Sequence, residues 1–413
     1  MNKKLLCVLL AFAMLFTLAA CGGGGNNNGG NTGKEDEPDY EAMSMDELYE
    51  LAKQESGTIT VYATTTDAST AAKKFSKQYP DLKIEYIGCD TDTVASKIEM
   101  ENETGNVNAD VLMVKDNSGE IYKELVLYDI LHIYYPQTIC SHIDKSLLAY
   151  GLPLYSTFNP WYYNNEKYPD GVPLESWWDI VEGYDETTGK FTNQKWTIYT
   201  KGITGPSYAS LWAQLIVDAD KVEAQYKKQY GKDLTYTYIS KLQNTAGVME
   251  LPENNAGVEL FYRFSQMKMT ELNDGDGVVE AVDKSLNGPT LGLTSASKKA
   301  NQSQGYNIEW VTGLAPYTAF QACSYLYVVD GCDNPAGARL YINFCLGGED
   351  GQSGCYSSFD KMGAWSIRDD VTFEKSSAEL KDVNLTTPDF DQLYIVYPNV
   401  KAYWTYWRSL AEK

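Results

Sequence analysis

Histidine is nearly absent from this chain, since only His132 and His142 occur in 413 residues. Catalytic triads and many metal sites depend on imidazole, so this scarcity weighs against a Ser-His-Asp hydrolase and a His-rich metal centre. Basic residues are also few: 34 Lys and Arg stand against 56 Asp and Glu, a net charge of −22. Because phosphates require a basic surface, we expect no nucleic-acid partner. Apolar residues make up 43% of the chain, which is enough to form buried cores.

Two common motifs are missing. The turn after the first predicted strand reads Thr64-Thr65-Thr66-Asp67 where a dinucleotide-binding fold would carry GxGxxG. No cysteine pair has CxxC spacing, which disfavours zinc and thioredoxin-like sites. Outside the cytoplasm, the cysteines that follow residue 21 can form disulfides or stay as buried thiols, and their pairing is left open. They are Cys89, Cys140, Cys323, Cys332, Cys345 and Cys355.

Only one long apolar run occurs, Leu5 to Ala20, and its 16 residues are fewer than the ~20 needed to span a bilayer. Lys3 and Lys4 precede it. It ends Leu-Ala-Ala-Cys at Cys21, which is similar to a bacterial lipobox. We therefore expect residues 1–20 to be a lipoprotein signal peptide and a lipid on Cys21 to be the only anchor, at the extracytoplasmic face of the cell membrane. An ordinary secretion signal and a short membrane anchor are the alternatives.

A tether is expected next. Residues 22–33 read GGGGNNNGGNTG, a composition that stays flexible and buries nothing. Order is expected from Ser44, because Ser44 and Glu47 fit a capping box at the start of a helix.

The remaining pattern predicts an α/β fold with two lobes. Strands over 58–63, 83–87 and 109–114 alternate with helices, as in parallel βαβ units, and a second such unit begins near Trp177. The aromatic stripe of the last helix is interpreted as core packing. The expected organisation is signal peptide 1–20, tether 21–43, first lobe 44–154, hinge crossover 155–163, second lobe 164–307, return to the first lobe 308–360, and a C-terminal segment 361–413 packing on the second lobe.

Several blocks carry a family likeness when they are taken together in this order. They are residues 58–79, 108–112, 173–180, 200–215, 275–282, 292–294, 333–352 and 363–368. With the lipobox, they resemble the extracellular solute-binding proteins of bacterial ABC importers, in the branch that binds ferric ion, polyamines, thiamine and phosphorylated compounds. The resemblance implies a type II periplasmic-binding-protein-like fold that closes on a solute between its lobes. It also implies a monomer without catalysis or cofactor, which hands its solute to a membrane permease with a cytoplasmic ATPase.

Candidate binding residues follow the carboxyl ends of the predicted strands, where helix N-termini present N–H groups to ligands. They are Thr64, Thr65, Thr66, Asp67, Thr91 and Asp116 in the first lobe, and Trp161, Gly205, Ser207, Tyr208, Thr294, Ser295 and Tyr317 elsewhere. The alternative is that the hydroxyl residues only cap helices. Hydroxyls at positive helix ends favour an organic anion or a phosphorylated compound. A neutral polyol or carbohydrate, a polyamine or thiamine, and an iron complex are the alternatives.

Ferric ion itself is disfavoured. In ferric-binding relatives, adjacent tyrosines follow the strand that matches residues 292–294. Here the chain continues Ser295-Ala296-Ser297-Lys298, and Lys298 would repel a cation. A surface adhesin or ligand sensor built on the same fold is the functional alternative to an importer component.

Three weaker patterns are interpreted as structural. Residues 205–209 (GPSYA) depart from the GxSxG nucleophile elbow at Ala209. Residues 273–277 (NDGDG) are similar to a calcium loop, but Leu272 stands where the first carboxylate is needed. Cys140 and His142 lie two apart, a spacing that does not place them on one helix face. We therefore expect neither enzymatic activity nor a metal site.

Overall fold

The structure is a computed structural model that describes residues 38–55, 57–238, 250–285, 288–376 and 380–411. The signal peptide, Cys21 and most of the expected tether lie outside the described residues. The expected capping box is confirmed at the start of α1 (Met45–Ala52): Ser44 Oγ accepts from Glu47 N at 3.3 Å, and the Glu47 carboxylate accepts from Ser44 N at 2.8 Å. Residues 40–413 form one compact unit.

The first lobe is built on a seven-stranded sheet in the order β15-β5-β14-β3-β1-β2, with β4 also paired to β14. The parallel strands β1, β2 and β3 are the three predicted from the sequence, and β14 runs antiparallel to β3. The strand bounds are β1 Thr58–Ala63, β2 Lys83–Gly88, β3 Val111–Val114, β4 Leu131–His132, β5 Leu152–Thr157, β14 Ala322–Val329 and β15 Trp365–Ser366. The helices of this lobe are α1, α2 (Asp67–Gln78), α3 (Thr91–Thr104), α4 (Gln137–Cys140) and α9 (Pro335–Cys345).

The second lobe is built on a five-stranded sheet in the order β10-β9-β11-β6-β12. Its strands are β6 Trp161–Asn164, β9 Thr197–Thr200, β10 Met269–Glu271, β11 Thr290–Leu293 and β12 Ile308–Trp310. Its helices are α5 Pro206–Val217, α6 Ala219–Tyr230, α7 Ala256–Gln266 and α8 Gly275–Lys284. Two-stranded pairs join β7 (Tyr184–Asp185) to β8 (Lys190–Phe191) and β13 (Ala319–Phe320) to β16 (Leu385–Thr386).

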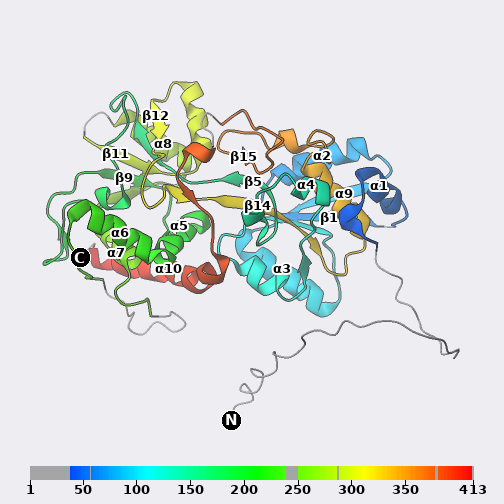
Figure 1. Cartoon of the computed structure of the whole chain (residues 1–413), viewed down its shortest axis with the longest axis horizontal. Helices are drawn as coiled ribbons and strands as arrows, with labels where there is room; N and C mark the ends of the chain where they lie inside the picture. Colours follow the sequence, from blue (N-terminus) through cyan, green and yellow to red (C-terminus); the bar gives the residue numbers. More distant parts are fainter. Residues whose placement is uncertain (1–37, 56, 239–249, 286–287, 377–379, 412–413) are drawn as a thin grey trace, which may run out of the picture. The chain divides into compact units, whose positions relative to one another are not determined.

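Strand pairing shows where the chain changes sheets. β5 belongs to the first sheet and β6, four residues later, to the second, so the chain crosses within the segment expected to do so. The return starts later than residue 308, because β12 still pairs with β6 in the second sheet. The expected C-terminal segment is divided: β15 pairs with β5 in the first sheet, whereas α10 (Phe390–Ala411) packs on α5 and α7 of the second lobe (Figure 1).

Helix α10 holds to both lobes. On the second lobe, Trp404 stacks on Phe261 of α7 with ring centroids 5.6 Å apart. This contact agrees with the core packing expected of the last helix. On the first lobe, Asp391 pairs with Lys123, and the Tyr394 hydroxyl donates to Glu124, both in the π-helical turn η2 (Ile121–Val126). In the described ranges, no helix combines the length and apolar character needed to cross a membrane.

Candidate functional site

A cavity of about 160 Å³ is lined by residues of both lobes. Its walls come from the end of β3, the β5–β6 crossover, the start of α5, the turn after β11 and the β13–β14 segment. The lining residues are Lys115, Thr157, Phe158, Asn159, Lys201, Ser207, Tyr208, Leu211, Ser295, Phe320 and Ala322. Three of the sequence-predicted residues, Ser207, Tyr208 and Ser295, are brought together here.

Lys115 is the most unusual group in the cavity. It directly follows β3, and its Nζ donates to Thr157 Oγ1 at 3.0 Å. Desolvation in the cavity and the nearby Lys361 lower the pKa of Lys115 to about 8. Within the part of the chain that the structure describes, no carboxylate oxygen lies within 4.0 Å of the Nζ atom of Lys115 or Lys201. The cavity therefore presents two cationic side chains that form no close ion pair with any described carboxylate, although Asp67 acts on Lys115 from farther away.

The predicted turn Thr64–Asp67 is not among the cavity lining. Asp67 Oδ2 accepts from Lys361 Nζ, from Tyr155 Oη at 3.2 Å and from Thr65 Oγ1 at 3.1 Å. Its charge is therefore paired with that of Lys361, and its carboxylate is not part of the cavity lining. The Thr64 amide donates to Met113 O at 3.1 Å, and Thr66 is an exposed helix N-cap that makes no side-chain capping bond.

The first turn of α5 faces the cavity with hydrogen-bond donors. Gly205 is the N-cap residue, Pro206 occupies the first turn, and Ser207 and Tyr208 line the cavity. Tyr208 Oη donates to Oγ1 of Thr294, which is itself buried, at 3.5 Å. The N-terminus of this 12-residue helix adds the positive end of a helix dipole to the two lysines.

Two predicted residues lie in the core of the second lobe and not at the cavity. Trp161 is 0% exposed and contacts Trp177 and Phe264, with ring centroids 5.8 and 6.0 Å away. Tyr317 is 2% exposed, and its carbonyl accepts from Trp177 Nε1 at 2.8 Å. Trp161 therefore packs among aromatic rings, Tyr317 is held in the buried interior, and neither residue is part of the cavity lining.

Thr91 and Asp116 line a smaller cavity of about 40 Å³. Asp116 accepts from the backbone amides of Gly119 at 2.7 Å and Tyr122 at 3.1 Å, so its carboxylate fixes the loop after β3. Burial raises its pKa to about 6, although these hydrogen bonds work in the opposite direction.

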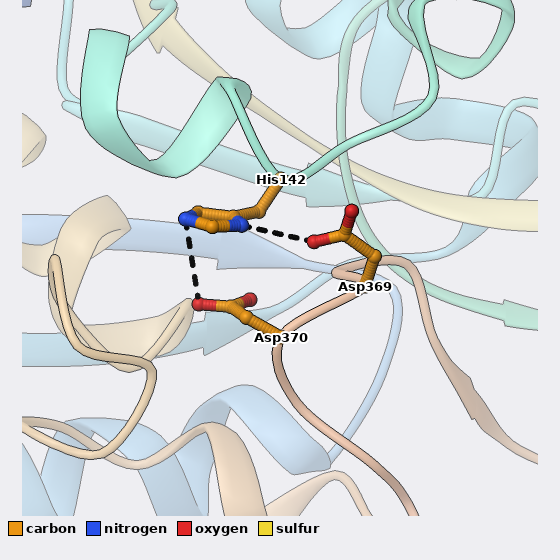
Figure 2. A group of neighbouring side chains, drawn as sticks. All are labelled: His142, Asp369 and Asp370. Carbon is orange, nitrogen blue, oxygen red and sulfur yellow. Dashed lines mark hydrogen bonds and ion pairs between the residues drawn. The ribbon is translucent and has the colours of Figure 1, made fainter.

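Three side chains in the described part of the chain form a group that could hold a metal ion: His142, Asp369 and Asp370 (Figure 2). His142 Nδ1 lies 2.9 Å from Asp369 Oδ1, whereas Nε2 lies 3.8 Å from Asp370 Oδ2. Each carboxylate thus faces a different nitrogen of the His142 ring. Arg368 also donates to both oxygens of Asp370. The arrangement is that of an ion-pair network.

The other suspected metal patterns are structural. His132 pairs with Asp330 at 2.7 Å, away from the His142 network. In the loop 273–277, Asp274 Oδ1 accepts from Gly277 N at 2.8 Å and so caps α8. Neither location gathers three ligand side chains within the described residues.

The comparisons with known proteins decide the family. A family model described as bacterial extracellular solute-binding protein matches residues 70–387. The chain belongs to this family. Its extracytoplasmic location and its place as the solute-binding partner of an ABC-type transporter follow from that membership, which confirms the resemblance drawn from the sequence. No curated protein matches the chain.

Solved structures show that the fold of this solute-binding protein is the two-lobed one expected. Apo ferric ion-binding protein A of Pasteurella haemolytica aligns with a TM-score of 0.60 at 12% identity, covering 86% of this chain and 98% of that one. Iron-bound HitA of Pseudomonas aeruginosa gives 0.58 at 12% identity, covering 85% and 99%. AfuA of Actinobacillus pleuropneumoniae with fructose-6-phosphate gives 0.51 at 17% identity, covering 86% and 99%. At these identities the likeness concerns the fold alone.

Proposed function

We propose that this chain is the lipid-anchored solute-binding component of an ABC importer, and that it captures a small organic anion or phosphorylated compound in the cavity lined by Lys115 and Ser207. The observation that carries the proposal is the cationic character of this cavity. A lysine that is desolvated and forms no close ion pair with a described carboxylate is costly for the free protein. A bound anion would remove that cost.

The charge of the cavity separates the candidate solutes. Polyamines and thiamine carry positive charge, which Lys115 and Lys201 would repel. Asp67, a carboxylate that acts on Lys115, is already paired with Lys361. A phosphate or carboxylate would instead accept from Lys115 Nζ, Ser207 Oγ and the Ser207 amide in the first turn of α5, as charge-assisted hydrogen bonds.

A ligand screen tests the solute class. Thermal denaturation of the purified protein is followed with phosphorylated sugars, organic acids, polyamines, thiamine, neutral sugars and iron complexes. A ligand present at 100 times its Kd should add ~2.7 kcal/mol to the free energy of unfolding. We expect phosphorylated compounds or organic acids to stabilise the protein. Stabilisation by a polyamine or thiamine alone would contradict the anion assignment.

The same assay with two variants tests the role of Lys115. Replacing a charged hydrogen-bond donor costs ~1.5–3 kcal/mol of binding, so Lys115→Met should weaken binding by about ten- to a hundred-fold. Lys73→Met is the matched control, because Lys73 is an exposed residue of α2 that lines none of the cavity. Equal affinities of the two variants would rule out Lys115 as a binding residue.

Lipid anchoring has its own test. A fatty-acid analogue fed to expressing cells should label the wild-type protein and leave Cys21→Ala unlabelled. Equal labelling of both would reject Cys21 as the acylated residue. A companion permease and ATPase encoded beside this chain would favour an importer over an adhesin or sensor.

A further inference from the structure

Two buried cysteines, Cys345 and Cys355, lie side by side at the C-terminal end of α9. They are 0% and 1% exposed and belong to the same cluster of buried residues, and each side chain acts on the other electrostatically. The backbone holds them there as well, since Cys355 N donates to Phe344 O at 2.8 Å. The main chain therefore holds the two cysteines close together, whatever rotamer each side chain adopts.

The loop between the two cysteines is built to bring the chain back onto α9. Gly347, Gly348 and Gly351 all have φ between +68° and +86°, a region that favours glycine. Gly354 passes so close to the helix end that a Cβ there would lie 2.0 Å from Phe344 O. These four glycines give the tight return that sets Cys355 against Cys345.

The other cysteines have different surroundings. Cys323 is packed with Tyr325 and Ser156, and Cys89 donates to Ile87 O at 3.7 Å. Among the described residues, the contacts of Cys89, Cys140, Cys323 and Cys332 include no second sulfur. All six described cysteines are thiols in this structure. Of the pairings left open by the sequence, only one therefore joins neighbouring sulfurs.

We propose that Cys345 and Cys355 form a disulfide in the exported protein. The family's extracytoplasmic location supplies the setting in which such bonds persist. The oxidant is the disulfide of an extracytoplasmic thiol oxidoreductase. Each cysteine loses its S–H proton, one S–S bond forms, and two electrons and two protons reduce the oxidant's disulfide to a dithiol.

The burial of the two thiols in the folded protein determines the stage at which the disulfide forms. It raises the pKa of the Cys345 thiol, and the thiolate is the reactive form. The exchange therefore takes place while the chain is still folding after export.

The bond secures a segment that reaches the ligand-binding region. Cys355 directly precedes the short helix η6 (Tyr356–Ser358). Phe359 follows and stacks on Tyr155 with centroids 5.6 Å apart, and Lys361 pairs with Asp67. A covalent link at Cys355 fixes the start of the segment that delivers both side chains.

Mass spectrometry of the full exported protein, extracted from membranes and alkylated without reduction, tests the bond. Trypsin cuts at Arg339 and Lys361, so one peptide, residues 340–361, carries both cysteines. A second cleavage after Glu349 separates them. We expect the two fragments to stay joined, about 2 Da lighter than the sum of the free thiol forms. Alkylation of both cysteines, or a link from either one to another cysteine, overturns the proposal.

Hydrogen exchange tests the anchoring of the segment. Reduction of the wild-type protein should speed amide exchange over residues 356–361 and leave β1 unchanged. The variant Cys345→Ala/Cys355→Ala should show the faster rates with or without reductant. Cys323→Ala, which removes another buried thiol, should keep the response of the wild type. Rates over 356–361 that are unaffected by reduction would overturn the anchoring.

Discussion

At the scale of single residues, Lys115 gives the proposed binding reaction a pH dependence. In the free protein its pKa is about 8, and a bound anion would raise that value because it stabilises the charged form. Binding should therefore take up protons near pH 8, and affinity should fall as the pH rises above about 8. Calorimetry at pH 8 in two buffers of different ionisation enthalpy measures the uptake. Lys115→Met should abolish it, and no uptake by the wild type would contradict the assignment.

Ser207 and Thr65 are predicted to contribute differently to solute binding, although both are equally good candidates from their positions in the sequence. Ser207 lines the cavity, whereas the Thr65 hydroxyl donates to Asp67 at 3.1 Å. Ser207→Ala should cost ~0.5–1.5 kcal/mol of binding, or up to ~3 with a charged partner. Calorimetry should then show a several-fold to hundred-fold weaker affinity for Ser207→Ala and near-wild-type affinity for Thr65→Ala. The reverse order would move the site to the Thr64–Asp67 turn.

At the scale of elements, the position of α5 depends on a glycine in its neighbour α7. A Cβ on Gly257 would lie 2.0 Å from Leu215 O in α5, so the helices touch through their backbones. Gly257→Ala should force them apart at a cost of ~1–3 kcal/mol or more. Urea denaturation should show this loss. Gly313→Ala is the control, because a Cβ there meets no atom within 4 Å and its φ is not positive. Equal stability of the two variants would contradict the close packing.

The elements themselves were predictable because their patterns are local. Alternation fixed β1 and β2, and the capping box fixed the start of α1. Only those cavity residues that lie at the end of a strand or helix, such as Ser207, were predictable from the sequence. Lys115 directly precedes the sequence candidate Asp116. The end of the third strand therefore marks this position in the sequence, but the proposed binding side chain is Lys115 and not Asp116. Phe320 and Lys361 reach the region through pairing of segments far apart in the chain, and no local pattern reports such pairing.

At the scale of the whole folded unit, the lobes are expected to close around the solute. The chain passes between the two sheets in few segments, and such connections permit hinge rotation. A hydrogen bond already links the two lobes near the cavity: Ser210 Oγ on α5 donates to the Asn117 carbonyl after β3. Small-angle scattering should show a smaller radius of gyration at saturating solute. Lys115→Met at the same solute concentration should show a smaller change. An unchanged wild-type profile would count against closure.

The position of α10 in the chain also sets an order of assembly during export. Trp404 and Trp407 contact Phe261, and Trp404 also contacts Phe264, but α10 is synthesised long after α7. Until then, this aromatic face of the second lobe has no cover, and the contacts of η2 with Asp391 and Tyr394 are still unmade. The contacts that join α10 to both lobes can therefore form only when nearly the whole chain is present. The two lobes of the folded unit therefore acquire their full set of contacts only after α10 has joined them.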